Sequence, residues 1–388
     1  MFVEVNYHQK QKEKNEICGD VFLSQKIKAE NRTIIVLADG LGAGIKANIL
    51  ASMTASMALN FVKANSPIEH TAKIIMSTLP VDSFRKISYC SFTILDIVGN
   101  NIKLIEYGNP GAFIWKDGRF FEPRKKEIGI PNHKVKQVLY TAELTINQFD
   151  RIILVTDGIT QSGIGGINTP FGWGRDDVKN YVHALLDENQ NTLAEDMAGK
   201  IITQAVKHDT YAAKDDMTCG VVYFREPRKV LFCTGPPYNE LNDNFLAREI
   251  DAFSGRKIIS GGTTAQIVSR ELQREINVNI SSVVPGLPPD SEMAGIDLVT
   301  EGILTLGKVS EFLQSLPQLN SDLKGPAGKI IKLFHENDEI IFLTGTRVNE
   351  AHQDPTLPVE LEIRRNVVKK IADLLESKFL KKVEIKYI

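Results

Sequence analysis

The sequence predicts an α+β domain followed by a smaller α/β domain, and three observations lead to this prediction. Strand-like runs in the first half follow one another in hairpin-like succession and are interrupted by pairs of helical stretches. The rhythm changes at residues 225–229 (REPRK), after which strands and helices alternate one by one. The length of 388 residues suffices for two or three domains with separate cores. We therefore expect domains at residues 1–225 and 229–388.

The strands of the first half are runs of β-branched and aromatic residues bounded by Gly, Asn, Asp or Pro. They are predicted at residues 2–5, 21–23, 33–38, 88–98, 103–107, 112–116, 119–122, 134–140, 151–156 and 219–224. Helical spacing of apolar residues predicts one helix pair at 45–64 and 68–79 and a second pair at 176–187 and 192–208. Asp117-Gly118, between two aromatic strands, predicts a hairpin turn.

The second half has the pattern of an α/β domain with a parallel core. Strands are predicted at residues 230–234, 257–260, 296–300 and 339–343, and helices at 242–253, 263–274, 308–316 and 358–378. No repeat of fixed period interrupts this alternation.

Composition excludes several classes of function. The net charge of −2 and the mixing of basic with acidic residues argue against nucleic-acid binding. No apolar run reaches the ~18 residues of a membrane span, and the polar N-terminus lacks a signal-peptide core. The four cysteines are scattered and form no CxxC pair, which indicates reduced thiols. We therefore expect a cytoplasmic protein.

Aspartates follow the buried strands of the first half. IIVLADG ends on Asp39-Gly40 and IILVTDG on Asp157-Gly158, while KDDMT places Asp215 and Asp216 just before a strand. Carboxylates at strand ends can converge at one edge of a sheet, where divalent cations such as Mg²⁺ or Mn²⁺ neutralise their repulsion. The alternative, that each aspartate only caps a helix or forms a turn, stays open at this point.

Four motifs occur in an order that resembles a known family. They are CGDVF (residues 18–22), ADGLGAG (38–44), VTDGIT (155–160) and KDDMT (214–218). Together with SYCSFTILDI (88–97) and YGNPGAFIW (107–115), they resemble the metal-dependent protein phosphatases of the PPM type, closest to the SpoIIE-like branch. The resemblance covers roughly residues 1–224 and implies an α-β-β-α sandwich, with two packed antiparallel sheets flanked by helix pairs.

The resemblance also implies roles for individual residues. Asp39 would bridge two metal ions, and the backbone carbonyl of Gly40 would bind the second ion. Asp157 and Asp215 would complete the shell of the first ion. With Asp39, these two are the expected catalytic residues, because ions held there activate the attacking water.

Two further aspartates have supporting roles in the same comparison. Asp216 stands where the family has Asn or Asp, and Asp20 would lie beside the second metal through water. The sequence departs from eukaryotic members at Leu41, where they carry a histidine, so the acid that protonates the leaving group is unassigned. No arginine near Asp20 replaces the one that holds substrate phosphate, and residues 162–174 occupy the place of the family's flap.

The resemblance thus implies a serine/threonine protein phosphatase with two Mn²⁺ or Mg²⁺ ions, a third ion being left open. Its substrate would be a dedicated phosphoprotein of the anti-sigma-factor antagonist kind, and a homodimer is left open. Helix 45–64 leaves the metal loop directly, so a shift of this helix could move Gly40 and carry a regulatory signal. Two alternatives remain: a PPM-like scaffold without strong activity, and a phosphatase of small metabolites.

The glycines after Asp39 suggest a phosphate cradle as a rival function for this loop. Gly40, Gly42 and Gly44 have the spacing G-x-G-x-G, and no acid follows near residues 60–64. A dinucleotide-binding loop requires G-x-G-x-x-G and an acid about 20 residues beyond. The pattern therefore favours a metal site over a nucleotide site.

The second half offers candidates without a recognised family. Gly261–Thr264, at a strand–helix junction, could bind a small anionic ligand, and a tight turn is the alternative. Asp297 and Glu301 follow strand positions and are expected to be surface caps rather than ligands. Loop 343–355 is a second candidate for lining a binding site of this domain, and its His352 is expected to be structural. From position alone, we expect a regulatory, ligand-binding or partner-binding domain.

Overall fold

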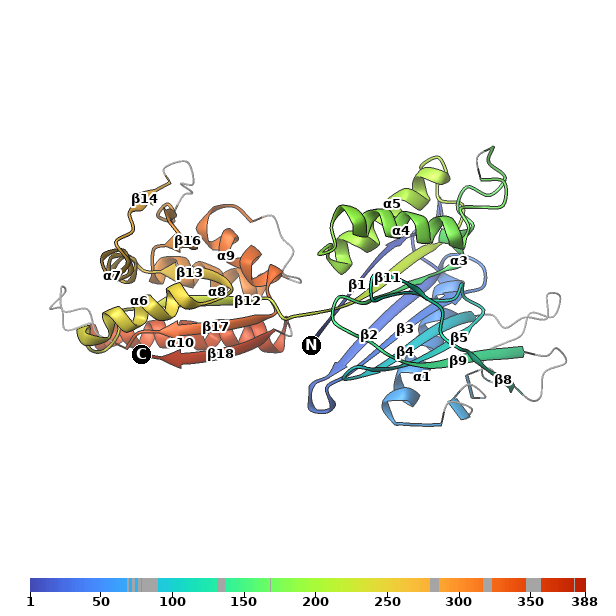
Figure 1. Cartoon of the computed structure of the whole chain (residues 1–388), viewed down its shortest axis with the longest axis horizontal. Coiled ribbons are helices and arrows are strands. Elements are labelled where there is room, and N and C mark those ends of the chain that lie inside the picture. The colour runs from blue at the N-terminus through green and yellow to red at the C-terminus, as the bar shows by residue number, and fades with distance from the viewer. Residues whose placement is uncertain are drawn as a thin grey trace. The chain divides into compact units, whose positions relative to one another are not determined.

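The computed structural model of the chain describes residues 1–67, 70–71, 74–75, 78, 90–130, 137–167, 169–279, 286–316, 323–346, 357–379 and 381–388. The chain divides into two compact units, Met1–Glu226 and Pro227–Ile388 (Figure 1). None of the helices in the described part of the chain combines the length and the apolar character that crossing a bilayer requires.

The first unit contains two antiparallel sheets. One has the order β1-β11-β10-β6-β7, made of β1 (Phe2–Lys10), β11 (Met217–Arg225), β10 (Arg151–Val155), β6 (Phe113–Lys116) and β7 (Arg119–Phe121). The other has the order β2-β3-β4-β5-β9-β8, made of β2 (Asp20–Ile27), β3 (Arg32–Gly40), β4 (Cys90–Val98), β5 (Asn101–Tyr107), β9 (Gln137–Thr145) and β8 (Lys126–Ile130). Short hairpins join β2 to β3, β4 to β5 and β6 to β7, and they are antiparallel because a short turn reverses the chain direction.

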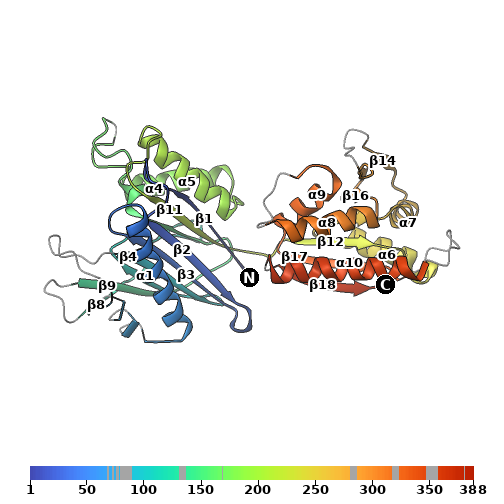
Figure 2. The same cartoon turned by 180° about the vertical axis from the view of Figure 1, so that it is seen from behind.

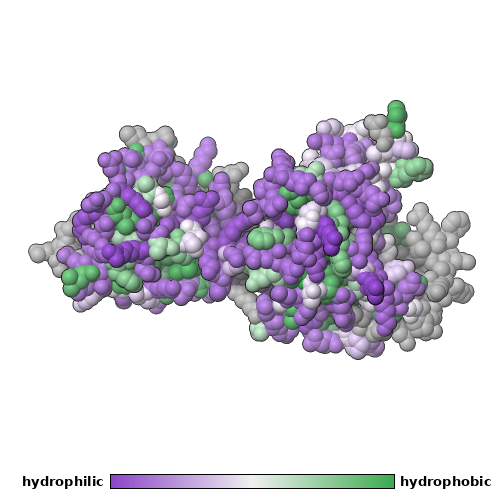
Figure 3. Space-filling model, in the orientation of Figure 1, coloured by the Kyte–Doolittle hydropathy of each residue, from purple (hydrophilic) through white to green (hydrophobic). Residues whose placement is uncertain are grey.

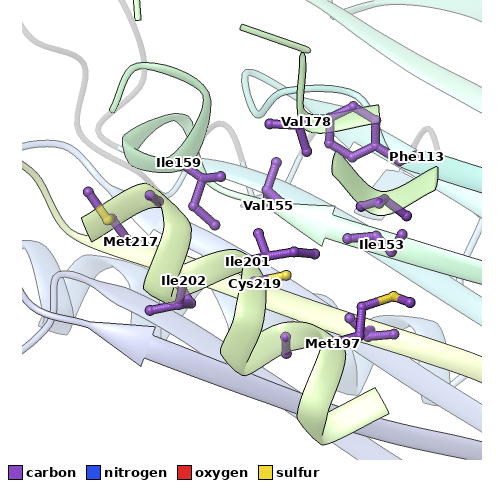
Figure 4. Packing of buried hydrophobic residues seen from close by; sticks show 14 of the residues in the cluster. Phe113, Ile153, Val155, Ile159, Val178, Met197, Ile201, Ile202, Met217 and Cys219 are labelled. Carbon is purple, nitrogen blue, oxygen red and sulfur yellow. The ribbon is translucent and has the colours of Figure 1, made fainter. Parts of the chain in front are cut away.

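The central strands β3, β10 and β11 carry buried residues on both of their faces. In β3, Ile35 and Leu37 point to the core between the two sheets, while Ile34 and Val36 point to α1 (Ile45–Lys63). Helices α4 (Arg175–Glu188) and α5 (Ala194–His208) cover the outer face of the other sheet (Figures 1 and 2). Figure 4 shows side chains of α5 and of the sheet strands meeting there. This is the predicted α-β-β-α sandwich.

The second unit is built around a seven-stranded sheet with the order β14-β15-β16-β13-β12-β17-β18. Its parallel core consists of β16 (Ile296–Thr300), β13 (Arg256–Ser260), β12 (Lys229–Thr234), β17 (Glu339–Thr344) and β18 (Lys382–Tyr387). Strands β14 (Ile276–Val278) and β15 (Ser291–Met293) extend it in antiparallel pairing. The predicted α/β domain with a parallel core is confirmed.

Helices cover both faces of this sheet. Helices α8 (Ile303–Ser315), α9 (Gly325–Glu336) and α10 (Leu357–Ser377) pack on the face that carries Val230 and Phe232. Helices α6 (Asp243–Ala252) and α7 (Gly262–Leu272) pack on the face of Leu231 and Cys233. Short 3₁₀ turns (Lys28–Glu30 and Glu240–Asn242) and the helix α3 (Asp157–Thr160) complete the described elements.

Several predicted bounds differ from the structure. Strand β1 continues to Lys10, beyond the predicted end at residue 5, because pairing with β11 extends into the polar part of the segment. Helix α8 begins at Ile303, five residues before the predicted start. Strands β8, β14, β15 and β18 and helices α3 and α9 were not predicted. Most of the helix predicted at 68–79 lies outside the described residues.

Local details that the sequence predicts are confirmed at two places. Asp117 and Gly118 connect β6 to β7 with φ angles of 49° and 77°, as a hairpin turn of this kind requires. All four cysteines are free, and Cys90, Cys219 and Cys233 are buried.

Candidate functional site

Acidic residues from both sheets come together where four strands begin or end. Asp20, the first residue of β2, pairs directly with Asp39 near the end of β3. Asp157 follows β10 as the first residue of α3, and Asp216 directly precedes β11, the neighbour of β10. Because the two sheets are stacked, these strand ends bring carboxylates of distant segments to one place.

Asp20 is the most firmly held of these carboxylates. Its Oδ2 atom accepts hydrogen bonds from Thr156 Oγ1 (2.9 Å) and Thr218 Oγ1 (2.8 Å). The side chain is only 3% exposed. Burial raises the pKa of Asp20 to about 7, although the two threonine hydroxyls act in the opposite direction.

Asp39 lies among carboxylates of the same charge. Burial raises its pKa to about 9, and the negative charges of Asp20 and Asp157 add to this rise. Burial, followed by the charge of Asp215, also raises the pKa of Asp157. Without a cation, protonation of Asp39 therefore relieves the repulsion between the carboxylates of Asp20, Asp39 and Asp157.

The two adjacent aspartates before β11 have different surroundings. Asp215 is partly exposed, 3.8 Å from the Nζ atom of Lys12, and burial raises its pKa. Asp216 is buried, and its Oδ1 accepts the backbone N–H of Lys12 (2.9 Å). Its Oδ2 atom is buried and has no partner among the described residues. An orphaned carboxylate oxygen of this kind costs free energy unless a donor or a cation reaches it.

Close backbone packing surrounds the acidic cluster. A Cβ atom on Gly40 would overlap the carbonyl oxygen of Ala47 in α1, so only glycine allows the helix to lie against the end of β3. A Cβ atom on Gly158 would likewise overlap the carbonyl oxygen of Asp216. Glycine therefore fixes the distance between the aspartate-bearing segments at both motifs.

The residues present suit hard divalent cations. The cluster combines carboxylates that raise each other's pKa with one orphaned carboxylate oxygen. Within the described residues, however, no group of three His, Cys, Asp or Glu side chains is already arranged to hold a metal ion.

Sequence reasoning missed three residues of this site. Thr156 and Thr218 face each other across β10 and β11, since the N–H of Thr218 donates to Thr156 Oγ1 (2.9 Å), and both hydroxyls hold Asp20. Lys12 contacts both Asp215 and Asp216. The two threonines could have been found from the sequence, because each lies within two residues of an aspartate in VTDG or DDMT. Nothing in the sequence indicates Lys12.

Residues 161–167 and 169–174 belong to a loop beside the cluster, directly after α3. Its start is held by Asp209, whose carboxylate accepts the N–H of Gly163 (2.7 Å), and by Lys214, whose Nζ donates to the carbonyl of Ile164 (2.9 Å). Trp173 anchors its end and is 5% exposed. Between these anchors, Ile167 is 101% and Phe171 91% exposed. We call residues 161–174 the rim loop.

The candidates of the second half belong to the second unit of the chain. Asp297 pairs with Arg256 and accepts the N–H of Lys257, as a surface cap does. Glu301 and Gly261–Thr264 line a cavity. Residues 347–355 of the predicted loop 343–355, including His352, lie outside the described residues.

Comparison with known proteins agrees with the fold and the motifs. The family model described as Stage II sporulation protein E (SpoIIE) matches residues 29–225. No curated protein matches the chain. Among solved structures, the phosphatase domain of SpoIIE from Bacillus subtilis is 16% identical, with a TM-score of 0.41, over 57% of this chain and 92% of that chain.

Two further structures are similar at the same distant level. The RsbU and RsbW domains of a Mycobacterium tuberculosis protein are 12% identical, with a TM-score of 0.46, over 64% of this chain and 68% of that chain. RsbX in complex with magnesium is 20% identical, with a TM-score of 0.39, over 57% and 94%. Similarity at this level bears on neither ligands nor substrates. The family model alone matches just over half of the chain, so the chain belongs to the SpoIIE family, the SpoIIE-like branch of the PPM-type phosphatases.

Proposed function

We propose that the first unit is a serine/threonine protein phosphatase that depends on two divalent cations, Mn²⁺ or Mg²⁺. The observation that carries this proposal is the cluster of carboxylates around Asp39, which destabilise each other and include an orphaned oxygen on Asp216. A protein gains nothing in stability from such an arrangement, so its use lies in binding cations. Family membership makes a phosphoryl group the natural substrate.

In this proposal Asp39, Asp157 and Asp215 would hold the cations together with the carbonyl of Gly40, while Asp20 and Asp216 support them. When bound, such ions acidify water and withdraw charge from phosphoryl oxygens. Asp20 is kept in place by its two threonine donors, which both bind its Oδ2 atom.

Lys12 supplies the cationic side chain that the family comparison left without a counterpart. Its Nζ atom lies 3.8 Å from Asp215, and its side chain is 42% exposed, so it can reach a substrate phosphate without breaking a buried pair.

The rim loop favours a protein over a metabolite as the substrate. Ile167 and Phe171 expose nearly their whole side chains beside the acidic cluster, and Ile164 is 48% exposed. In Figure 3, hydrophobic atoms project from the first unit where Figure 1 draws this loop. Exposed apolar side chains around a polar site are typical of protein-docking surfaces.

Regulation is proposed through α1 and the second unit. The backbone of α1 lies directly against Gly40, so a displacement of this helix would move a proposed metal ligand.

The substrate is proposed to be a dedicated phosphoprotein of the anti-sigma-factor antagonist kind.

Hydrolysis of p-nitrophenyl phosphate with and without Mn²⁺ tests the enzyme proposal. Wild type is expected to turn over only with the metal, and the double variant Asp39→Ala, Asp157→Ala is expected to be inactive. If wild type shows no metal-dependent turnover above this variant, the chain is a PPM-like scaffold instead.

A second experiment tests the protein substrate. The change Phe171→Ser is expected to raise KM for a phosphoserine protein while turnover of p-nitrophenyl phosphate stays unchanged. The matched control is Val98→Ser, another exposed apolar residue, which pairs with Arg32 at the end of β3 opposite to Asp39. High turnover of phosphorylated metabolites with none on phosphoserine peptides would establish the metabolite phosphatase instead.

A further inference from the structure

The parallel sheet of the second unit ends in a row of hydroxyl side chains. Thr234 of β12 pairs with Ser260 of β13 and with Thr344 of β17, and Ser260 pairs with Thr300 of β16. All four side chains are buried. A glycine follows each of them within two residues. These glycines are Gly235, Gly261, Gly345 and Gly302.

A cavity of about 340 Å³ opens at this edge of the sheet. Its walls come from the loops after β12, β13 and β16 and from α10. The chain passes from β12 to β13 on one side and later returns to β17 on the other side of β12. In open α/β sheets, ligands bind outside the carboxyl ends of the strands at such a reversal. The volume is at the lower end of the range for small-molecule sites.

Two helix N-termini meet at the cavity. Helix α7 follows Gly261 and helix α8 follows Gly302, and within the described residues neither start is capped by a side chain. A Cβ atom on Gly302 would lie 3.5 Å from the Cα of Gly261, so the two starts are neighbours. Uncapped N–H groups and the positive ends of two helix dipoles favour an anion at this place.

A buried hydroxyl group points independently to a ligand. Thr264 lines the cavity, is fully buried, and its Oγ1 has no hydrogen-bond partner among the described residues. This oxygen lies 3.5 Å from the position that a Cβ atom on Gly261 would take. Leaving a buried hydroxyl unpaired costs free energy, which a ligand oxygen would recover.

Among the described residues, the remaining walls carry one positive charge, one negative charge and apolar surface. The guanidinium of Arg364 lies against Gly235, since a Cβ atom there would be 2.7 Å from its Nη1. The backbone carbonyl of Glu301 accepts a hydrogen bond from Ser260 Oγ (3.1 Å), whereas its side-chain carboxylate has no partner within the described part of the chain and can accept hydrogen bonds from ligand hydroxyls. Leu304 is 65% exposed, and with Pro236 it offers an apolar surface.

We propose that this cavity binds a small phosphorylated, hydroxyl-bearing metabolite of the nucleotide or sugar-phosphate class. The phosphate lies at the starts of α7 and α8 within reach of Thr264 and Arg364. The hydroxyl groups of the ligand face Glu301, and its less polar part lies against Leu304. This site is in the second unit and is independent of the proposed phosphatase activity.

Isothermal titration calorimetry of the full chain tests the proposal. The probes are AMP, glucose 6-phosphate, inorganic phosphate and adenosine, in EDTA so that no cation at the acidic cluster attracts phosphate. We expect AMP or glucose 6-phosphate to bind with one site per chain, more tightly than inorganic phosphate, while adenosine does not bind. Which of the two binds distinguishes a nucleotide from a sugar phosphate.

Variants locate the binding. Thr264→Val and Arg364→Gln are each expected to weaken binding of the phosphorylated probe about tenfold or more. The matched control is Thr305→Val, because Thr305 is the third residue of α8 as Thr264 is of α7. It too is fully buried with an unpartnered Oγ1 among the described residues, but it does not line the cavity. Its effect is expected to be less than about twofold.

Three results would overturn the proposal: no phosphorylated probe binds, adenosine binds as tightly as AMP, or Thr264→Val and Thr305→Val have the same effect. Circular dichroism establishes that each variant is folded. Should Thr264→Val fail to fold, the partly exposed Arg364 still decides, because unchanged affinity in Arg364→Gln contradicts the proposed phosphate position.

Discussion

Replacing Asp39 by asparagine is expected to stabilise the metal-free protein and to abolish its binding of divalent cations. Burial and the neighbouring carboxylates raise the pKa of Asp39 from 3.8 to about 9. Because the folded-state pKa is raised, the contribution of this group to stability is fully present below the unfolded value and is lost as pH rises through about 9. Asparagine has nearly the same shape and carries no charge, so it escapes this loss.

The size of the effect follows from the shift. Roughly three pKa units separate the unfolded value from about pH 7, and at ~1.4 kcal/mol per unit they correspond to a ceiling of ~4 kcal/mol. The side chain of Asp39 is partly exposed to solvent, so water screens part of its charge. We therefore expect Asp39→Asn to raise the free energy of unfolding by about 2 kcal/mol near pH 7, with the gain vanishing toward about pH 4.

Urea unfolding in EDTA, followed by tryptophan fluorescence, measures this gain. The chain has two tryptophans, Trp115 and Trp173, and both lie in the first unit, so the signal reports on that unit. Asp150→Asn is the control. Both of its carboxylate oxygens accept backbone N–H groups (2.9 and 2.7 Å), so this change is expected to destabilise the unit by ~1–3 kcal/mol. The reasoning is refuted if Asp39→Asn destabilises the metal-free unit, or if its gain does not grow with pH.

Two further predictions concern the same site. Binding of Mn²⁺ must displace the proton on Asp39. The affinity for Mn²⁺, measured by calorimetry, is therefore expected to rise about tenfold per pH unit between about pH 7 and 9, with one proton released. An affinity independent of pH would contradict the raised pKa of Asp39. Gly158→Ala forces a Cβ atom onto the carbonyl of Asp216 and is expected to cost ~2–4 kcal/mol in urea unfolding, whereas Gly129→Ala, with nothing within 4 Å, is expected to stay within ~1 kcal/mol. Equal effects of the two alanines would show that the strand ends are not closely packed.

The sequence predicted what depends on local patterns. Asp39 and Asp157 could be identified because each follows an aliphatic strand and precedes a glycine, and four motifs in one order pointed to the family. Most strands of the sandwich are runs of β-branched and aromatic residues between turn-forming residues, so most of them could be predicted. Strand β18 was missed because three of the six residues in its run KVEIKY are charged, as suits an edge of the sheet.

Long-range pairing set the limit of prediction. The N–H of Thr218 reaches Thr156 across 62 residues, and the N–H of Lys12 reaches Asp216 across 204 residues. No local pattern encodes such contacts, since they exist only after β1, β10 and β11 have formed one sheet. For the same reason the hydroxyl row Thr300–Ser260–Thr234–Thr344 becomes visible only in the register of four strands.

Anomalous diffraction from crystals of the full chain grown with Mn²⁺ shows whether Asp39 binds two metal ions. We expect two manganese peaks about 4 Å apart that share the carboxylate of Asp39, with Asp157 and Asp215 beside one of them. Crystals of Asp39→Asn grown under the same conditions are expected to lack both peaks. A protein that hydrolyses phosphoserine with Mn²⁺ but shows no manganese at Asp39 would contradict the account.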